Sequence, residues 1–231
     1  MEPKDIDWIN FWDKKALSSS DFEATGRGNM SIFGLIHTFH DCYNYLELNK
    51  SDNFLDIGCG SGLLSLMISN FVKLVTGVDI SKNMIKRAIL NCQDVKNLKF
   101  KRNSITDMSF KKEQFDKILI YSVLHYLKSF DEVESVVKKL KKITKKNSRI
   151  FIAAIPDFKK KKIYIDFIEK NFKGEKKKLE IRAIDKILWF DKNKLSKILK
   201  SYNFKFKFKS LNPNIWQNFY MFDCIIEGFY E

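Results

Sequence analysis

The sequence has little cysteine, proline or arginine, and it has no long apolar run. Its four cysteines are scattered without a C-x-x-C pair, which argues against a zinc ribbon and against a disulfide-rich secreted domain. No apolar stretch approaches the roughly 20 residues of a bilayer span, and the opening MEPKDIDWIN lacks the basic and apolar regions of a signal peptide. We therefore expect a cytoplasmic protein without a membrane span.

Positive charge is plentiful but unevenly placed. Residues 1–100 carry 11 basic and 12 acidic side chains, whereas residues 101–231 carry 31 and 16, which accounts for the net charge of +14. Only five of the 42 basic residues are arginine, the side chain that bidentate phosphate or base contacts favour. The lysines of residues 138–146 surround a predicted helix instead of forming a stripe, so we interpret them as a solvated face. Nucleic acid is the disfavoured partner, although an anionic partner stays open.

Apolar periodicity predicts an α/β protein. Residues 31–48 have the spacing of an amphipathic helix, and from residue 53 short apolar runs alternate with helical ones. This alternation predicts a doubly wound, Rossmann-like, mostly parallel sheet with helices on both faces. The strands expected in it are residues 53–57, 73–78, 98–102, 115–120 and 149–155, and the helices between them are 62–70, 81–93 and 129–144.

The chain changes character after Pro156. Residues 157–190 are rich in lysine and predict a helical insertion that shapes the substrate site, and residues 191–201 predict a further helix. Two late strands, 202–209 and 219–226, predict an antiparallel hairpin at the end of the sheet. We expect an N-terminal helical cap over residues 1–50 and a main domain over 51–231.

The most informative segment is FLDIGCGSGLLS, residues 54–65. Gly58, Gly60 and Gly62 follow a strand and open a helix, where backbone can approach a ligand closely. The spacing fails the dinucleotide pattern G-x-G-x-x-G, because its last position is Leu63, and no Lys-Ser/Thr pair completes a P-loop. Neither phosphate-binding motif is therefore present.

Two carboxylates point to a different ligand. Asp56 lies at the strand end two residues before the first glycine, where it would repel a pyrophosphate and attract a cation. Asp79 ends the next strand, where an acidic residue commonly accepts hydrogen bonds from ribose hydroxyls. A ligand with a ribose, no phosphate and a cationic amino-acid end is S-adenosylmethionine.

Three motifs carry a family resemblance. The segments DIGCGSG (56–62), VTGVDIS (75–81) and FDKILIYSVLHYL (115–127) resemble, in order and spacing, the class I S-adenosylmethionine-dependent methyltransferases, whose fold is a seven-stranded sheet. GRGNMS (26–31) and NIWQNFYMFD (214–223) also resemble methyltransferases of bacterial surface-carbohydrate modification, including capsular phosphoramidate assembly.

The resemblance implies a set of cofactor-binding residues. Gly58 and Gly60 would flank the methionine part and Asp79 would take the ribose hydroxyls. The family often places an Asp after the third strand, where this chain has Ser104; either Ser104 and the Ile105 backbone substitute for it, or Asp107 reaches in. The full set of expected cofactor contacts is Arg27, Asp56, Gly58, Cys59, Gly60, Asp79, Ile80, Met84, Ser104, Ile105 and Tyr121.

His125 is the candidate catalytic residue. Small-molecule O-methyltransferases of this family frequently place a His just after the fourth strand, where it can act as a general base or orient the substrate. The alternative is a histidine that only packs or caps the loop. His37 and His40 stand three apart on the early helix, but no third ligand completes a set, so we expect no metal site.

The acceptor site is expected to draw on aromatic and basic residues. Residues 25–30, with Trp8 and Trp12 upstream, are interpreted as a lid in which Arg27 binds the cofactor carboxylate or an anionic acceptor, or is an ordinary surface residue. Further acceptor contacts are expected from Tyr126, Trp216 and Tyr220.

The sequence thus predicts O-methylation of a small, sugar-like or phosphorylated acceptor in bacterial surface-carbohydrate biosynthesis. A tRNA or rRNA methyltransferase and a non-catalytic, cofactor-binding partner subunit are the alternatives. The oligomeric state is left open.

Overall fold

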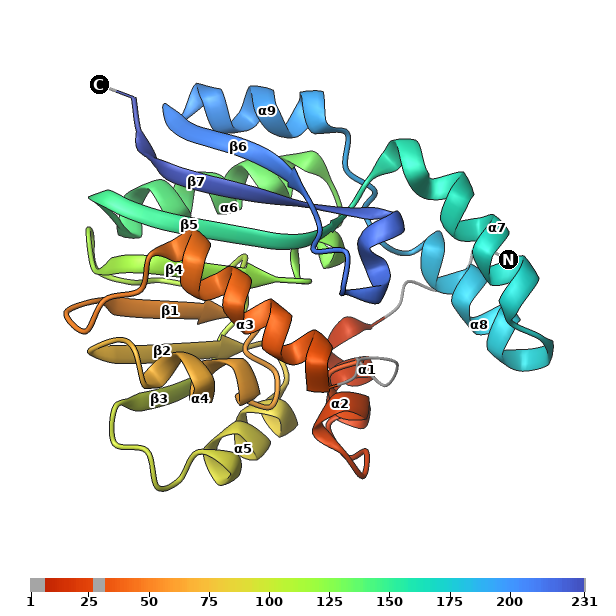
Figure 1. The fold of residues 1–231 in the computed structure, drawn as a ribbon, viewed down its shortest axis with the longest axis horizontal. Coiled ribbons are helices and arrows are strands. Elements are labelled where there is room, and N and C mark those ends of the chain that lie inside the picture. The colour runs from red at the N-terminus through yellow and green to blue at the C-terminus, as the bar shows by residue number, and fades with distance from the viewer. Residues whose placement is uncertain (1–6, 27–31, 231) are drawn as a thin grey trace.

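A single seven-stranded sheet organises the chain. The computed structural model describes residues 7–26 and 32–230, and its strands follow the order β3-β2-β1-β4-β5-β7-β6 (Figure 1). The pairs from β3 to β5 are parallel, whereas β7 runs antiparallel to both β5 and β6. The predicted fold class, with its antiparallel C-terminal hairpin, is confirmed. The strands are β1 Asn53–Ile57, β2 Leu74–Asp79, β3 Leu98–Arg102, β4 Phe115–Tyr121, β5 Thr144–Pro156, β6 Phe204–Ser210 and β7 Met221–Phe229.

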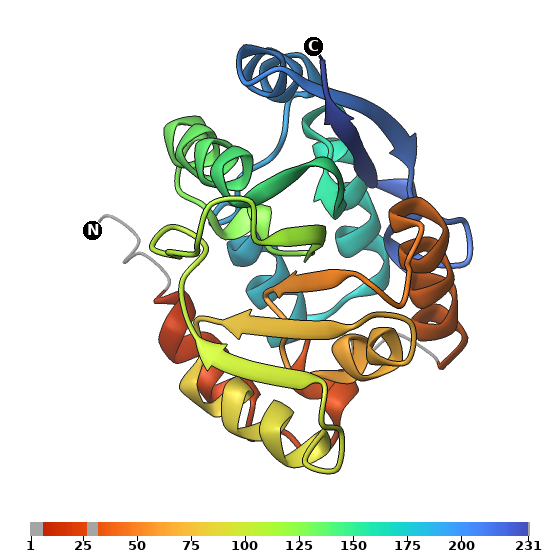
Figure 2. The ribbon, with the colours of Figure 1, turned by 90° about the vertical axis from the view of Figure 1, so that its left-hand side faces the viewer.

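Helices cover both faces of this sheet. Figure 2 shows α3 and α4 on one side and α6 on the other, and each side has its own buried apolar cluster. Nearly all residues of the central strands β1 and β4 are buried, as expected of parallel strands that are covered on both faces. The helices of the sheet layers are α3 Ile32–Leu46, α4 Leu63–Ser69, α5 Lys82–Asn91, α6 Phe130–Ile143 and α9 Lys192–Ser201.

The fifth strand is longer than the sequence predicts. β5 begins at Thr144, five residues before Arg149, where the predicted strand starts. The Lys145 ammonium lies 2.7 Å from a carboxylate oxygen of Asp116, and the Ser148 hydroxyl donates to the Phe115 carbonyl. These polar contacts hold the early part of the strand, and they leave no apolar pattern in the sequence.

The N-terminal region divides into two parts. α1 (Trp8–Lys15) and α2 (Asp21–Ala24) lie at the end of the sheet toward which the parallel strands run (Figure 1). α3 instead packs on the sheet against β4 and β5, and the Tyr45 carbonyl accepts from the Arg149 guanidinium at 3.2 Å. The cap expected over residues 1–50 includes α3, which packs on the sheet of the main domain. The boundary at residue 50 therefore stays a prediction.

The expected insertion is helical and returns to its starting point. It contains the 3-10 turn η2 (Phe158–Lys160), α7 (Lys161–Asn171) and α8 (Gly174–Ile184). Its two ends meet where Phe158 donates its N–H to the Phe190 carbonyl at 3.0 Å. In the ranges 7–26 and 32–230, no helix combines the length and the apolar character that crossing a bilayer requires.

Candidate active site

A cavity of about 600 Å³ opens at the carboxyl ends of the parallel strands. Its walls come from the loops after β1, β2, β3 and β4, and α1 and α2 lie over it. The order of the sheet places the β2 and β3 loops at one end of the cavity and the β4 loop at the other. Crevices at this edge are the usual ligand sites of open α/β sheets.

The glycine loop forms the floor. Gly58 and Gly60 adopt φ angles of +76° and +54°, which side chains rarely tolerate. A Cβ built on Gly58 would lie 2.2 Å from a Val123 methyl, and one on Gly60 would lie 3.0 Å from a Thr25 methyl. The loop is therefore a close-packed turn that only glycine fits at residue 58.

Two carboxylates fix the loop and face the cavity. Asp79 accepts the Gly60 N–H at 3.0 Å and the Ser81 N–H at 2.9 Å, one on each oxygen. A carboxylate has about four acceptor sites, so Asp79 retains capacity for a ligand hydroxyl. Burial raises the pKa of Asp79, while these backbone N–H groups oppose the rise. Asp56 is 2% exposed and accepts the Ser65 hydroxyl at 2.5 Å.

The end of the cavity beyond Asp79 suits a flat ring. Ile80, Met84 and Ile105 contribute apolar walls there, and Ser104 and Thr106 share a hydrogen bond of 2.8 Å between their hydroxyls. Among the described residues the lining includes Ser104 but not Asp107, which supports the first of the two alternatives weighed for this position.

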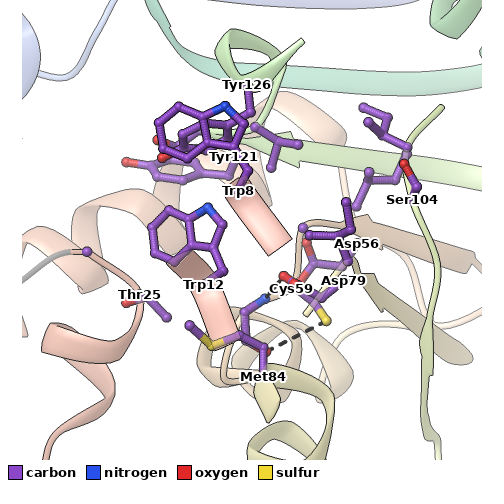
Figure 3. Close-up of a pocket in the computed structure, with 18 of the residues that line it drawn as sticks. Trp8, Trp12, Thr25, Asp56, Cys59, Asp79, Met84, Ser104, Tyr121 and Tyr126 are labelled. Carbon is purple, nitrogen blue, oxygen red and sulfur yellow. Dashed lines mark hydrogen bonds between the residues drawn. The ribbon is translucent and has the colours of Figure 1, made fainter. Parts of the chain in front are cut away.

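Specific contacts hold α1 and α2 over the cavity. An Asp13 carboxylate oxygen on α1 accepts the Ser81 hydroxyl at 2.5 Å and the Asn83 N–H at 3.0 Å, which ties α1 to the start of α5. The Arg87 guanidinium on α5 lies 2.6 Å from Asp21 and also donates to the Ala16 and Ser18 carbonyls. Two residues of the cap, Trp8 and Trp12, thereby become walls of the cavity (Figure 3).

Comparison with known proteins assigns this architecture. Residues 55–152 match the protein family described as "Methyltransferase domain". Residues 55–152 of this chain therefore form a methyltransferase domain.

Individual relatives resemble the methyltransferase domain over a limited length. An uncharacterised methyltransferase, YcgJ of Bacillus subtilis, is 28% identical over 108 residues, 46% of this chain and 42% of that protein. The ubiquinone biosynthesis O-methyltransferase of Pelagibacter ubique is 31% identical over 106 residues, 46% of this chain and 43% of that protein. The alignments thus span less than half the length of these curated relatives.

Similarity of fold extends over nearly the whole chain. The N-methyltransferase NodS of Bradyrhizobium japonicum, solved with S-adenosyl-L-homocysteine, superimposes with a TM-score of 0.68 at 12% identity. That superposition covers 95% of this chain and 97% of NodS. At this identity, the likeness concerns the fold alone.

Most of the cofactor residues expected from the sequence meet in the cavity of the methyltransferase domain. Ten of the eleven line it, and Arg27 lies outside the described residues, so its two expected roles stay predictions. The ten are Asp56, Gly58, Cys59, Gly60, Asp79, Ile80, Met84, Ser104, Ile105 and Tyr121.

His125 lies elsewhere. The cavity lining includes its neighbour Tyr126 but not His125, whose side chain is 5% exposed. Burial lowers the pKa of His125 to about 3, and its Nδ1 atom has no hydrogen-bond partner. The imidazole is therefore neutral and faces the protein interior. This placement gives no geometric support to the role of His125 as a general base, which stays a prediction.

The three aromatic residues expected at the acceptor site do not all line the cavity. Tyr126 lines the cavity, whereas Trp216 and Tyr220 do not. The Tyr220 ring stacks on Tyr164 with centroids 4.0 Å apart and belongs to the core. Beside them, Gln217 of the 3-10 turn η3 (Trp216–Phe219) does reach the cavity.

Several lining residues escaped the sequence-based list. Within the described ranges, residues 157–190 contribute no lining residue, so the role expected for the insertion in shaping the substrate site stays a prediction. Lys128, just before α6, and Glu132, in its first turn, do line the cavity, and Gln217 comes from far along the chain. The only local pattern near Lys128 and Glu132 is S-F-D-E at residues 129–132. This capping pattern predicts the start of a helix and gives no indication of a ligand.

Proposed function

We propose that this protein transfers the methyl group of S-adenosylmethionine to a small-molecule acceptor. One observation carries the proposal: the glycine loop and the carboxylates of Asp56 and Asp79 face one cavity together with the rings that follow β4. A volume of about 600 Å³ is in the range of small-molecule sites and has room beside the cofactor for a compact acceptor.

The residues present fit this cofactor. Asp79 retains acceptor capacity for ribose hydroxyls, and Asp56 offers negative charge to the amino-acid end. Ile80 and Ile105 would enclose the adenine between apolar walls. When bound, the cofactor supplies a methyl group on a positively charged sulfur, and the protein's part is to align the acceptor with it and to exclude water.

The finer prediction concerns the acceptor. Transfer to a hydroxyl requires a group that removes the proton, and His125 does not line the cavity. A phosphorylated acceptor needs cations, and Lys128 is the one cationic side chain on the described part of the lining. O-methylation of a sugar-like or phosphorylated acceptor therefore stays a prediction that these two observations do not support.

Isothermal titration with S-adenosylhomocysteine tests the proposal. The wild-type protein should bind it, and Asp79→Ala should weaken binding about tenfold or more, because hydrogen bonds to a charged group contribute about 1.5–3 kcal/mol. Asp94→Asn, an exposed carboxylate on the turn after α5, is the matched control and should bind as the wild type does. No binding by the wild type, or equal binding by Asp79→Ala, would refute the proposal.

Turnover separates the alternatives. A non-catalytic partner subunit would bind the cofactor and methylate none of a panel of amines, hydroxyl compounds and RNA. An RNA methyltransferase would bind RNA with an affinity that falls steeply with salt, because phosphate contacts release counterions.

A further inference from the structure

Aromatic rings gather at the β4 end of the cavity. Trp8 and Trp12 project from successive turns of α1, and Tyr126 follows β4 in the 3-10 turn η1 (Leu124–Tyr126). The Tyr126 ring centroid lies 4.6 Å from that of Trp8 and 5.6 Å from that of Trp12, with interplanar angles of 57° and 78°. Three rings with strongly inclined planes form a corner, which we call the aromatic corner (Trp8, Trp12 and Tyr126).

The aromatic corner lies on the acceptor side of the glycine loop. The ribose carboxylate, Asp79, ends β2, and β1 with its loop separates β2 from β4 in the sheet. Figure 3 shows Trp8, Tyr121 and Tyr126 together on one side of the cavity and Asp56 and Asp79 apart from them. A cofactor that extends from Asp79 across the glycine loop would therefore point its reactive end toward the rings.

Negative charge accompanies the rings. On the described part of the lining, Asp7 and Glu132 carry carboxylates at this end of the cavity, against the single ammonium of Lys128. Asp7 precedes Trp8 and caps α1, accepting the Ile9 N–H at 3.0 Å. The Glu132 carboxylate accepts the Lys128 backbone N–H at 2.8 Å, so it is held at the cavity by the main chain.

Aromatic rings with more carboxylates than ammonium groups, as on the described part of this lining, are the chemistry that recognises an organic cation. The faces of tryptophan and tyrosine carry negative potential, and several rings around one site bind ammonium groups. We propose that the acceptor is a small organic amine and that the aromatic corner with Glu132 binds its nitrogen. This inference rests on the proposed function, since it places the amine as the methyl acceptor.

Methyl transfer to an uncharged amine needs no protein base at the moment when the nitrogen attacks. The lone pair of the uncharged nitrogen forms the new N–C bond, the S–C bond breaks, and the sulfur keeps that electron pair as a thioether. A proton carried by the nitrogen leaves to water. Positive charge thus moves from sulfur to nitrogen, and the aromatic corner stabilises it where it develops. The absence of His125 from the lining agrees with this chemistry.

The test compares a cation with its neutral isostere. Protein saturated with S-adenosylhomocysteine is titrated calorimetrically with choline, with 3,3-dimethylbutan-1-ol and with inorganic phosphate. Choline should bind about tenfold more tightly than the neutral alcohol, because a desolvated cation–π contact contributes up to about 2 kcal/mol. Phosphate should not bind more tightly than the alcohol.

Variants assign the effect to the aromatic corner. Trp8→Leu should bring the choline affinity down to that of the alcohol, and Trp8→Phe should restore part of the difference. Glu132→Gln keeps an acceptor for the Lys128 N–H and should weaken choline binding more than alcohol binding. Phe11→Leu is the control, because Phe11 packs edge-on against both tryptophans from outside the lining and should leave the ratio unchanged.

Each outcome decides. Equal or tighter binding of the alcohol or of phosphate would overturn the amine assignment, as would failure of all three probes to bind while S-adenosylhomocysteine binds. A protein that does not bind S-adenosylhomocysteine would remove the proposed function itself, and the amine assignment with it.

Discussion

Asp223 makes the stability of this fold depend on pH. Its side chain is 1% exposed and lies opposite a bulge in β5, where two residues face one on β7. The bulge leaves the N–H of Ala154 without a partner in the ladder, and an Asp223 carboxyl oxygen accepts it at 2.9 Å. Burial raises the pKa of Asp223 to about 7 from its usual 3.8, and the nearby Asp41 carboxylate adds to the rise.

The direction of the effect follows from this pKa. Because the folded state holds the proton up to about pH 7 and the unfolded chain releases it near pH 4, the group stabilises the fold at low pH, and this contribution is lost as pH rises through 7. The full shift corresponds to about 4 kcal/mol at about 1.4 kcal/mol per pKa unit. About 3 kcal/mol of this stabilisation is lost between pH 5 and pH 8.

Asp223→Asn isolates this contribution. The amide oxygen still accepts the Ala154 N–H and the side chain no longer ionises. The free energy of unfolding of the variant, relative to that of the wild type, should therefore rise by about 3 kcal/mol from pH 5 to pH 8. The measurement is the free energy of unfolding by urea, followed by circular dichroism at pH 5, 6, 7 and 8. Ionisation of other groups cancels in the difference between the two proteins.

Two further variants separate ionisation from hydrogen bonding. Asp223→Leu loses the acceptor as well, and it should lie about 1–3 kcal/mol below Asp223→Asn at every pH. Asp94→Asn, in an exposed turn, should track the wild type. A difference between Asp223→Asn and the wild type that stays constant within about 0.5 kcal/mol from pH 5 to pH 8 would refute the reasoning.

Three other variants test the site and the residues that hold it. Gly58→Ala should abolish detectable binding of S-adenosylhomocysteine in calorimetry, because its Cβ would lie 2.2 Å from a Val123 methyl at a φ of +76°; binding within about threefold of wild type would contradict this. Arg87→Ala should expose residues 16–24 to limited proteolysis, since it removes the hydrogen bonds that hold α2, whereas the exposed Lys86→Ala should not; equal cleavage rates would count against it. His125→Gln should lower turnover less than tenfold, against the 10²–10⁴ typical of a lost general base. The same variant should resist acid better than the wild type, because the buried imidazole stabilises the fold above about pH 6.5 and that contribution is lost as pH falls toward about 3; an unchanged acid midpoint would argue against it.

The fold and the cofactor side of the cavity follow from local sequence. The alternation of apolar runs places the parallel strands, and the glycine spacing with Asp56 and Asp79 lies within 25 residues of chain. Such signals are short-range and depend on backbone conformation, which glycine and strand periodicity report directly. The early start of β5 escaped prediction because the Lys145–Asp116 ion pair, not an apolar pattern, holds it.

The acceptor side of the cavity depends on which way neighbouring side chains face, and no local sequence pattern reveals this orientation. His125 and Tyr126 are adjacent, yet one is buried in the protein and the other lines the cavity. They lie in a 3-10 turn, where successive side chains point about 120° apart, so only one of two neighbours can face a given side. The turn also has a partner far along the chain, since Leu188 donates its N–H to the His125 carbonyl at 2.8 Å. Leu188 lies outside the lining, so a contact that no local pattern encodes helps to hold the turn from which Tyr126 faces the cavity.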